Sequence, residues 1–217
     1  MIFSYRLSYL PRRSTFIRQF SEVAHLTNRQ CILVDGPQAN DFLQSLTTNQ
    51  MKLLAVHRGL FTAFLNPKGR VLFDAFIYHS EENRYILDVH KDMYERAISH
   101  LKRYILRSKV TLDKLDTSVY QAWPTTKDPK NTAFDALQTK VTSQLDYLAI
   151  RDPRNEKMGF RYLINSLQNV ELHGELVSEK LYNVNRISLG VPEGPADFVP
   201  DVSLPLECNV DLMAGGN

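Results

Sequence analysis

The sequence has few cysteines, little net charge and no long apolar stretch. Its 217 residues include only Cys31 and Cys208 as cysteines, too few for a disulfide framework or a self-contained zinc or cluster site, which suits a reducing compartment. The 26 basic residues nearly balance the 24 acidic ones, so charge does not indicate nucleic acid as a partner. Apolar runs such as 31–34 hold four residues, far below the roughly 20 that span a bilayer, so membrane insertion is not expected.

The short motifs of common enzyme classes are also missing from the sequence. Neither a Walker loop nor a Gly-x-Gly-x-x-Gly run is present. The six histidines show no His-x-x-x-His spacing that would place two metal ligands on one helix face. No nucleophile elbow supports a Ser-His-Asp triad. The sequence therefore predicts no metal site and no catalytic residue, and it disfavours an enzyme with recognisable machinery.

Acidic residues do not occur before Glu22. The segment that precedes it contains Arg6, Arg12, Arg13 and Arg18 among serines and scattered apolar residues. This composition is typical of a mitochondrial transit peptide, and a disordered basic tail is the alternative. We therefore assign residues 1–26 to a transit peptide, removed near residues 18–26, and exclude about the first 25 residues from the fold argument.

The first half of the remaining chain alternates between strand-like and helix-like patterns. These segments are a strand over 30–35, a short helix after Gly36-Pro37, a hairpin over 59–78 that turns at 66–69, a strand over 84–89 and an amphipathic helix over 90–110. This order favours an α+β fold in which helices cover mostly antiparallel sheets. We assign residues 27–118 to a first α+β subdomain.

The second half gives a weaker pattern, which we assign to a second α+β subdomain over residues 119–217. The segments are a long polar loop over 124–136, strands over 145–153 and 159–165, a helix over 174–184 and an irregular, proline-bearing stretch from Gly190 onward. Near its end the sequence carries apolar residues such as Val210 and Met213 into the small-residue turn 215–217, a pattern that would suit the middle of a folded unit.

Asp74 is the acid with the most unusual surroundings. It lies within the strand-like run 71–77, where alternation groups it with Leu72, Phe76 and Tyr78 on one face. A carboxylate in an apolar strand must be paired, hydrogen-bonded or neutral, because burial of an isolated charge is very costly. Asp74 is therefore either a ligand-binding group that accepts from N–H donors or a structural acid satisfied by an arginine or by backbone amides.

Glu207 and the two cysteines leave similar alternatives. Glu207 lies in an irregular, largely apolar segment, where its carboxylate could accept from an amino-pyrimidine ring or anchor its own loop. Cys31 lies in a predicted strand and is expected to be inert core. Cys208 is expected to be more accessible, and nothing in its surroundings indicates an activated thiol.

Several segments occur together in the order of a known family. They are "VDGPQANDFLQSLTTNQ", "GLFTAFLNPKGRVLFDAFIY", "RYILRSKVTL", "RDPRNEKMGFRYLI", "RISLGVPEG" and "SLPLECNVDLMAGGN". On these stretches, which run through residues 27–217, the sequence resembles the folate-binding YgfZ/GcvT-like family, in particular its mitochondrial iron–sulfur cluster assembly factors. The transit-like start agrees with the mitochondrial branch.

The resemblance implies that the sequence is incomplete at its C-terminus. In such proteins, the segment similar to "LPLECNVDLMAGGN" is followed by a Lys-Gly-Cys-Tyr-x-Gly-Gln-Glu signature and a final β-barrel domain, and this sequence contains neither. The signature cysteine is the family's candidate cluster ligand, and Cys208 does not match it. The resemblance thus implies an iron–sulfur cluster only in a longer form, held jointly with a partner.

The resemblance also implies a folate site. Related glycine-cleavage aminomethyltransferases have an Asp-Asp pair where this sequence reads Phe73-Asp74, and a folate-contacting Glu where it has Arg161. Both departures count against transferase chemistry. The family's tetrahydrofolate pocket would be retained through Asp74, Arg186 and Glu207.

Three functions follow from these expectations. The first is a folate-binding accessory protein of the mitochondrial matrix that supports late maturation of [4Fe-4S] proteins, with A-type cluster carriers as partners and no turnover of its own. The second is a tetrahydrofolate-dependent one-carbon transferase. The third is a fragment without activity.

Overall fold

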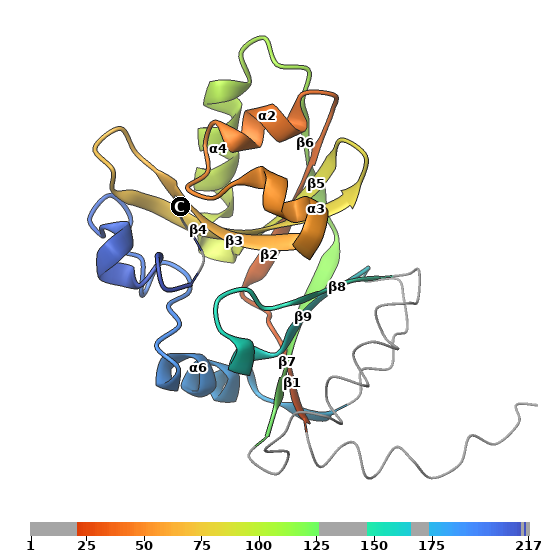
Figure 1. Ribbon diagram of the computed structural model, residues 1–217, viewed down its shortest axis with the longest axis vertical. Helices are drawn as coiled ribbons and strands as arrows, with labels where there is room; N and C mark the ends of the chain where they lie inside the picture. Colours follow the sequence, from red (N-terminus) through yellow and green to blue (C-terminus); the bar gives the residue numbers. More distant parts are fainter. Residues whose placement is uncertain (1–20, 126–146, 166–173, 214, 216–217) are drawn as a thin grey trace, which may run out of the picture.

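Two five-stranded sheets form the framework of the chain (Figure 1). The computed structural model describes residues 21–125, 147–165, 174–213 and 215. The first sheet has the strand order β3-β4-β5-β2-β6, and the second has the order β10-β1-β7-β9-β8. Helices α2, α3 and α4 cover the side of the first sheet that faces away from the second (Figure 1). The fold is therefore α+β, as predicted.

The first sheet is antiparallel throughout. Its strands are β2 (Arg29–Asp35), β3 (Gly59–Leu65), β4 (Val71–Glu81), β5 (Arg84–His90) and β6 (Thr111–Leu115). The β3–β4 turn is fixed by Asn66, whose Oδ1 accepts from the backbone N–H groups of Lys68 at 2.9 Å and Arg70 at 3.0 Å. Gly69 follows at φ +74°, a conformation that glycine adopts without steric cost. The predicted strands and hairpin are confirmed.

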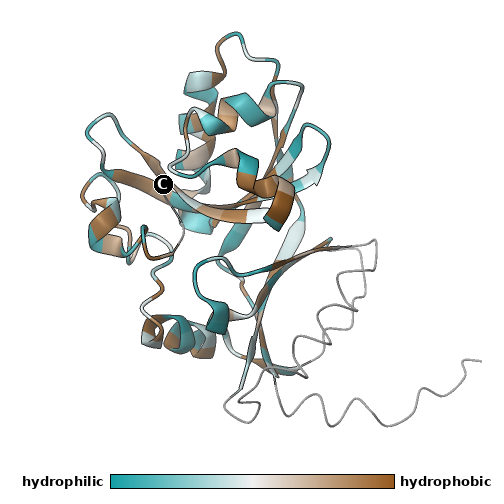
Figure 2. Cartoon of the chain, viewed as in Figure 1, coloured by the Kyte–Doolittle hydropathy of each residue, from teal (hydrophilic) through white to brown (hydrophobic). Residues whose placement is uncertain are grey.

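The helices on the first sheet bury their apolar faces against it. They are α2 (Ala39–Gln44), α3 (Leu54–His57) and α4 (Tyr94–Ile105), with 3₁₀ turns η1 (Met51–Leu53) and η2 (Lys91–Met93) before α3 and α4. Phe42 of α2 and Leu101 of α4 pack in one cluster with inward residues such as Phe64, Phe73 and Leu87. In Figure 2 the apolar colour follows β3 and β4 where these strands pass beneath the helices. The amphipathic helix predicted over 90–110 is confirmed in its central part.

The second sheet is mixed. Its strands are β1 (Ser21–His25), β7 (Thr117–Pro124), β8 (Tyr147–Arg151), β9 (Phe160–Asn165) and β10 (Glu175–Val177), with η3 (Glu156–Met158) between β8 and β9. β1 pairs antiparallel with β7 and parallel with β10, so it is an interior strand. The chain passes from the second sheet to the first between His25 and Arg29, and returns to the second between Leu115 and Thr117.

Two expectations need correction here, and they share one cause. Residues 21–25 form strand β1, so the last part of the segment 1–26 assigned to a transit peptide belongs to the second sheet. The helix predicted over 174–184 is wrong in its first part, because residues 175–177 form β10 and α6 spans Glu179–Ser188. Residues 175–177 form a strand because β1 is their partner, and β1 lies within the first 25 residues, which the sequence-based fold prediction left out.

Ser178 separates these two elements. Its side chain accepts from the backbone N–H of Leu181 at 3.3 Å, an N-cap that starts α6. The predicted strands over 145–153 and 159–165 are confirmed as β8 and β9. Residues 126–136 of the expected polar loop lie outside the described residues.

A second apolar cluster fills the layer between the two sheets. It joins Cys31, Phe61, Phe76 and Tyr78 from the first sheet to Ala24, Val119, Trp123 and Leu163 from the second. Tyr182 of α6 and Val210 of the C-terminal segment complete it. The stretch from Gly190 onward is irregular as predicted, apart from a 3₁₀ turn, η4 (Pro205–Cys208). None of the helices in the described part of the chain is long and apolar enough to cross a bilayer.

Candidate functional site

Charged side chains occupy inward positions on strands of both sheets, within the layer between them. They are Arg29 on β2, Asp74 on β4, Asp88 on β5 and Arg161 on β9, each at most 6% exposed. Strand alternation places them there, because inward positions recur every second residue. The cost of removing a charge from water is several kcal/mol even after the protein relaxes, so each of them requires partners.

Asp88 joins the two sheets. Its Oδ1 accepts from Nε of Arg29 at 2.6 Å, and its backbone carbonyl accepts from Nη2 of the same arginine at 2.7 Å. Its Oδ2 accepts from Nε of Arg161 at 2.8 Å. Arg161 also lies over the ring of Phe76, with its guanidinium carbon 4.2 Å from the ring centroid, a cation–π arrangement. One carboxylate therefore connects strands β2, β5 and β9.

Glu193 lies at the centre of a second group of charges. Its Oε2 accepts from Nη1 of Arg154 at 2.6 Å, from Nη1 of Arg161 at 3.2 Å and from the hydroxyl of Tyr182 at 2.8 Å. Burial raises the pKa of Glu193. The positive charges of Arg161, Arg154 and Arg29 together lower the pKa by more than burial raises it, so it lies well below its ordinary value. Glu193 is therefore ionised at neutral pH. Burial, followed by Glu193, raises the pKa of Tyr182 to about 12.

Asp74 lies beside this network and is only partly satisfied by it. Its Oδ1 accepts from the backbone N–H of Gly194 at 3.1 Å. Its Oδ2 is 3.8 Å from Nη1 of Arg29, an ion-pair distance too long for a hydrogen bond. Burial raises the pKa of Asp74 more than Arg29 lowers it, and the nearby Glu193 raises it further. The structure thus gives Asp74 both partners of the structural alternative, a nearby arginine and a backbone amide, and leaves its Oδ2 without a hydrogen bond among the described residues.

Three polar atoms in this layer have no hydrogen-bond partner among the described residues. They are Oδ2 of Asp74, Nη1 of Arg29 and Nη2 of Arg161. Buried polar atoms in native proteins nearly always have partners, so each exception calls for an explanation such as a bound group or water. The layer therefore offers one acceptor and two donors, a set that fits a polar ligand with both N–H and carbonyl groups.

Strand alternation predicted that Leu72, Phe76 and Tyr78 lie on the same face of the sheet as Asp74. This prediction is right for Phe76 and Tyr78 and wrong for Leu72. Phe76 and Tyr78 share the inter-sheet cluster, whereas Leu72 packs beneath the helices. The reason is an irregularity in the β3–β4 register, where Phe64 pairs with Phe73 but Leu65 pairs with Val71. A bulge of this kind shifts one residue to the other face.

Residues 14–122 match the family model described as the GCVT N-terminal domain. The chain belongs to this family. The glycine cleavage system aminomethyltransferase T of Bartonella henselae is similar in structure, with a TM-score of 0.69, at 15% sequence identity over 92% of this chain and 59% of that one. At this identity the likeness concerns the fold alone.

Several curated relatives of this GCVT-family chain come from fungi. Proteins named "Iron-sulfur cluster assembly factor IBA57 homolog, mitochondrial" are 32% identical in Neurospora crassa, over 88% of this chain and 45% of the relative, and 34% identical in Pyricularia oryzae, over 86% and 47%. The chain therefore spans about half the length of the curated relatives that it matches.

The other residues expected at a folate site, Arg186 and Glu207, take different places in the structure. Arg186 is buried, and its Nη1 donates to the carbonyl of Val191 at 3.1 Å and to Asp197. Asp197 also accepts from the backbone N–H of Glu193 at 3.0 Å. Arg186 thus supports the loop that carries Glu193 and the Gly194 partner of Asp74.

Glu207 is exposed and lies outside this network. Its carboxylate accepts from the backbone N–H of Leu204 at 3.2 Å, which closes the η4 turn. This contact is the loop-anchoring alternative considered for Glu207. An exposed carboxylate with one backbone partner carries no sign of a binding role by itself.

Most of the charged layer was not singled out from the sequence. Asp88 had the same signal as Asp74, an acid inside an apolar strand-like run, and could have been found on that ground. Arg29, Arg154 and Glu193 lie at a strand end or in irregular segments. Their burial depends on partners far along the chain, so no local pattern predicts it.

The two thiols differ as expected. Cys31 is fully buried between the sheets, and burial, followed by the charge of Asp88, raises its pKa well above the ordinary value. Its assignment to inert core is confirmed. Cys208 is half-buried, and its thiol donates to the carbonyl of Asp197 at 3.6 Å.

Proposed function

We propose that this chain belongs to a folate-binding accessory protein of the mitochondrial matrix that supports late maturation of [4Fe-4S] proteins. The observation that carries the proposal is the buried Asp74 in a GCVT-family fold. Its Oδ2 lies at an ion-pair distance of 3.8 Å from Nη1 of Arg29, and neither of these atoms, nor Nη2 of Arg161, has a hydrogen bond among the described residues. The relatives named as mitochondrial iron–sulfur cluster assembly factors supply the biological context. The arginine-rich, acid-free start is consistent with import into mitochondria.

Tetrahydrofolate fits the chemistry of this layer. Its pterin ring carries several N–H donors and a carbonyl acceptor, which matches the free oxygen of Asp74 and the free nitrogens of Arg29 and Arg161. In this proposal Asp74 holds the ring, and Arg186 keeps the 193–194 loop in place through Asp197. Glu207 stays a prediction, because its Oε2 anchors the backbone N–H of Leu204 and only its remaining acceptor capacity could serve folate.

The surroundings of Phe73 favour an accessory role over transferase chemistry. The resemblance to aminomethyltransferases places an acid at this position, but Phe73 is 1% exposed and stacks on Phe64 beneath the helices, with ring centroids 4.5 Å apart. Arg161, which stands where those enzymes have a folate-contacting Glu, is held by Asp88 and Glu193. One carboxylate, Asp74, cannot both orient an amine and handle a proton.

A one-carbon transferase remains the second candidate because of the structural likeness to an aminomethyltransferase. An assay of the chain with tetrahydrofolate and an aminomethyl donor distinguishes the two. Formation of methylenetetrahydrofolate would contradict the accessory role. Under that role, an iron–sulfur cluster is cargo shared with an A-type carrier, and the buried Cys31 is not available as its ligand.

Asp74→Asn tests the folate site. We expect tetrahydrofolate affinity, measured by calorimetry, to fall about tenfold or more, because a charge-assisted hydrogen bond contributes roughly 1.5–3 kcal/mol. Asp113→Asn, which changes an exposed aspartate on β6, is the control and should bind as the wild type does. Unchanged affinity in a folded Asp74→Asn variant would assign Asp74 a structural role only.

A further inference from the structure

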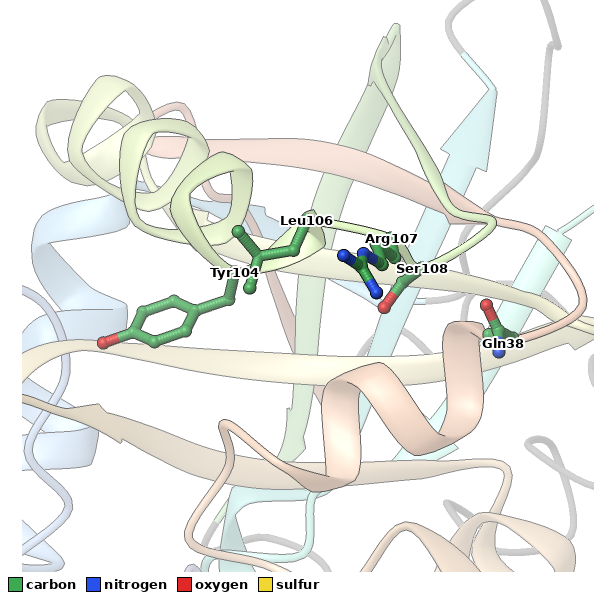
Figure 3. Close-up of a pocket in the computed structure, with 5 residues that line it drawn as sticks. All are labelled: Gln38, Tyr104, Leu106, Arg107 and Ser108. Atoms are coloured by element: carbon green, nitrogen blue, oxygen red, sulfur yellow. The ribbon is translucent and has the colours of Figure 1, made fainter.

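A groove runs between α4 and the β3–β4 turn, on the helix-covered side of the first sheet. It consists of two depressions of about 300 Å³ and 270 Å³ that share Asn66, Pro67, His100 and Tyr104 as lining residues. We call it the α4 groove. Tyr104 also borders a more open depression of about 710 Å³ toward Gln38 and Arg107, where Figure 3 shows the Tyr104 hydroxyl pointing away from both. The α4 groove is separate from the charged layer, which lies on the opposite face of the sheet.

Part of the polar lining is committed to holding the groove in shape. Asp201 accepts from the side chain of Asn66 at 2.9 Å and also pairs with Arg96. The hydroxyls of Ser45 and Thr47 donate to the backbone carbonyls of Phe42 at 2.7 Å and Asn49 at 3.1 Å. The hydroxyl of Thr48 similarly donates to the carbonyl of Gly215 at 2.6 Å. These groups define the walls and have little left to offer a ligand.

The other polar groups that line the groove can each donate a hydrogen bond. Arg103 forms no ion pair with any described residue, and neither Ser99 nor the hydroxyl of Tyr104 has a hydrogen bond there. His100 is 9% exposed, and its buried Nε2 has no hydrogen-bond partner in the described part of the chain. With Arg96 balanced by Asp201, the groove has one excess positive charge, on Arg103.

The remaining walls are apolar. Leu72 lines the depression that contains Arg103, whereas Leu46 and Leu65 line the other. Pro67 lies at the junction of the two. The groove therefore has a cationic, donor-rich end and a less polar end, with the imidazole of His100 between them.

We propose that the α4 groove binds a small molecule that carries a phosphate or carboxylate group next to an apolar or aromatic body. An oxyanion accepts hydrogen bonds without donating, which complements the free donors, and its charge complements Arg103. The leucines and Pro67 would contact the body. The small volumes and the buried imidazole favour a small molecule over an extended segment of another protein.

The test uses the 217-residue chain and three probes, which are phenyl phosphate, benzoate and inorganic phosphate. NMR of the carbon-bound imidazole protons of His100 reports on binding. Phenyl phosphate or benzoate should shift these signals in a saturable way and bind more tightly than inorganic phosphate. Failure of all three probes to shift them, or equal binding of all three, would overturn the proposal.

Arg103→Gln and Lys102→Gln form a matched pair, since they remove the same charge from neighbouring positions of α4 and only Arg103 lines the groove. Arg103→Gln should weaken binding about tenfold or more, and Lys102→Gln by less than about threefold. Equal weakening of binding by the two substitutions would show that the anion is attracted by the overall positive charge of α4 and is not bound in the groove. Tighter binding of tetraglutamate than of phenyl phosphate, with the same loss in Arg103→Gln, would instead identify a protein partner.

The outcome is independent of the folate proposal. Asp74→Asn should leave binding of phenyl phosphate in the groove unchanged, because Asp74 faces the other side of the sheet. Arg103→Gln should likewise leave tetrahydrofolate binding unchanged. Loss of both activities in either variant would overturn the assignment of two separate sites.

Discussion

Replacing Glu193 with glutamine tests whether the charged layer is a coupled network. Glu193 faces three buried arginines, with carboxylate oxygens 2.6 Å from Nη1 of Arg154, 3.2 Å from Nη1 of Arg161 and 3.6 Å from Nη1 of Arg29. Glutamine keeps the shape but removes the charge, which leaves an excess of buried cations. Removal of one partner from a buried ion pair costs about 3–5 kcal/mol.

Denaturant unfolding at neutral pH should show a loss of this size. For a chain of this size about 2–4 °C of melting temperature accompanies each kcal/mol, so the melting temperature should fall by roughly 6–20 °C. The loss is limited by Asp74, because Glu193 contributes to raising its pKa, and Asp74 ionises more readily once that charge is gone.

The effect should depend on pH in one direction. Because the pKa of Glu193 is held well below its ordinary value of 4.5 in the folded state, its contribution to stability is present above that value. The contribution is lost as pH falls through the folded-state pKa. The difference between wild type and Glu193→Gln should therefore shrink below pH 4.5. Glu82→Gln, at an exposed position, is the control. A Glu193→Gln variant within about 0.5 kcal/mol of wild type, the range of ordinary surface changes, would refute the network.

Two further predictions concern the backbone and the thiols. Gly36→Ala should lower the free energy of unfolding by about 2 kcal/mol or more, because the new Cβ would lie 2.1 Å from the carbonyl oxygen of Lys109 at φ +141°. Gly69→Ala, at φ +74° with no atom within 4 Å, should cost only about 1 kcal/mol, and equal losses in urea titrations would contradict this account. Cys208 should react with dithionitrobenzoate in the native protein and Cys31 only after unfolding, so fast labelling of both thiols would show that the inter-sheet layer opens readily.

The parts of the fold that were predictable from sequence are those with local causes. The β3–β4 hairpin follows from two apolar runs around an Asn-Pro-Lys-Gly turn, and α4 follows from apolar residues at helical spacing. The same reasoning placed Asp74 inside a sheet. Strands β1 and β10 are short, and each depends on a partner about 150 residues away along the chain. The burial of Glu193 and Arg154 depends on their contact with each other and with the sheets around them, and no periodicity in the sequence predicts it.

The position of β1 has a consequence for how the chain folds. Every strand of the first sheet, from Arg29 to Leu115, lies in sequence between β1 and its neighbour β7. Bringing β1 and β7 together in an otherwise unfolded chain closes a loop of roughly 90 residues, at an entropic cost of about 4 kcal/mol.

The first sheet removes most of that cost. Its first and last strands, β2 and β6, are themselves paired, with Cys31 opposite Leu115. Once this sheet has formed, the two chain ends leave it side by side, and the backbone N–H of Leu26 can donate to the carbonyl of Val119 at 2.8 Å. Folding should therefore proceed in a fixed order during synthesis, in which β1 stays unpaired until the first sheet is complete and then pairs with β7 almost as a hairpin would.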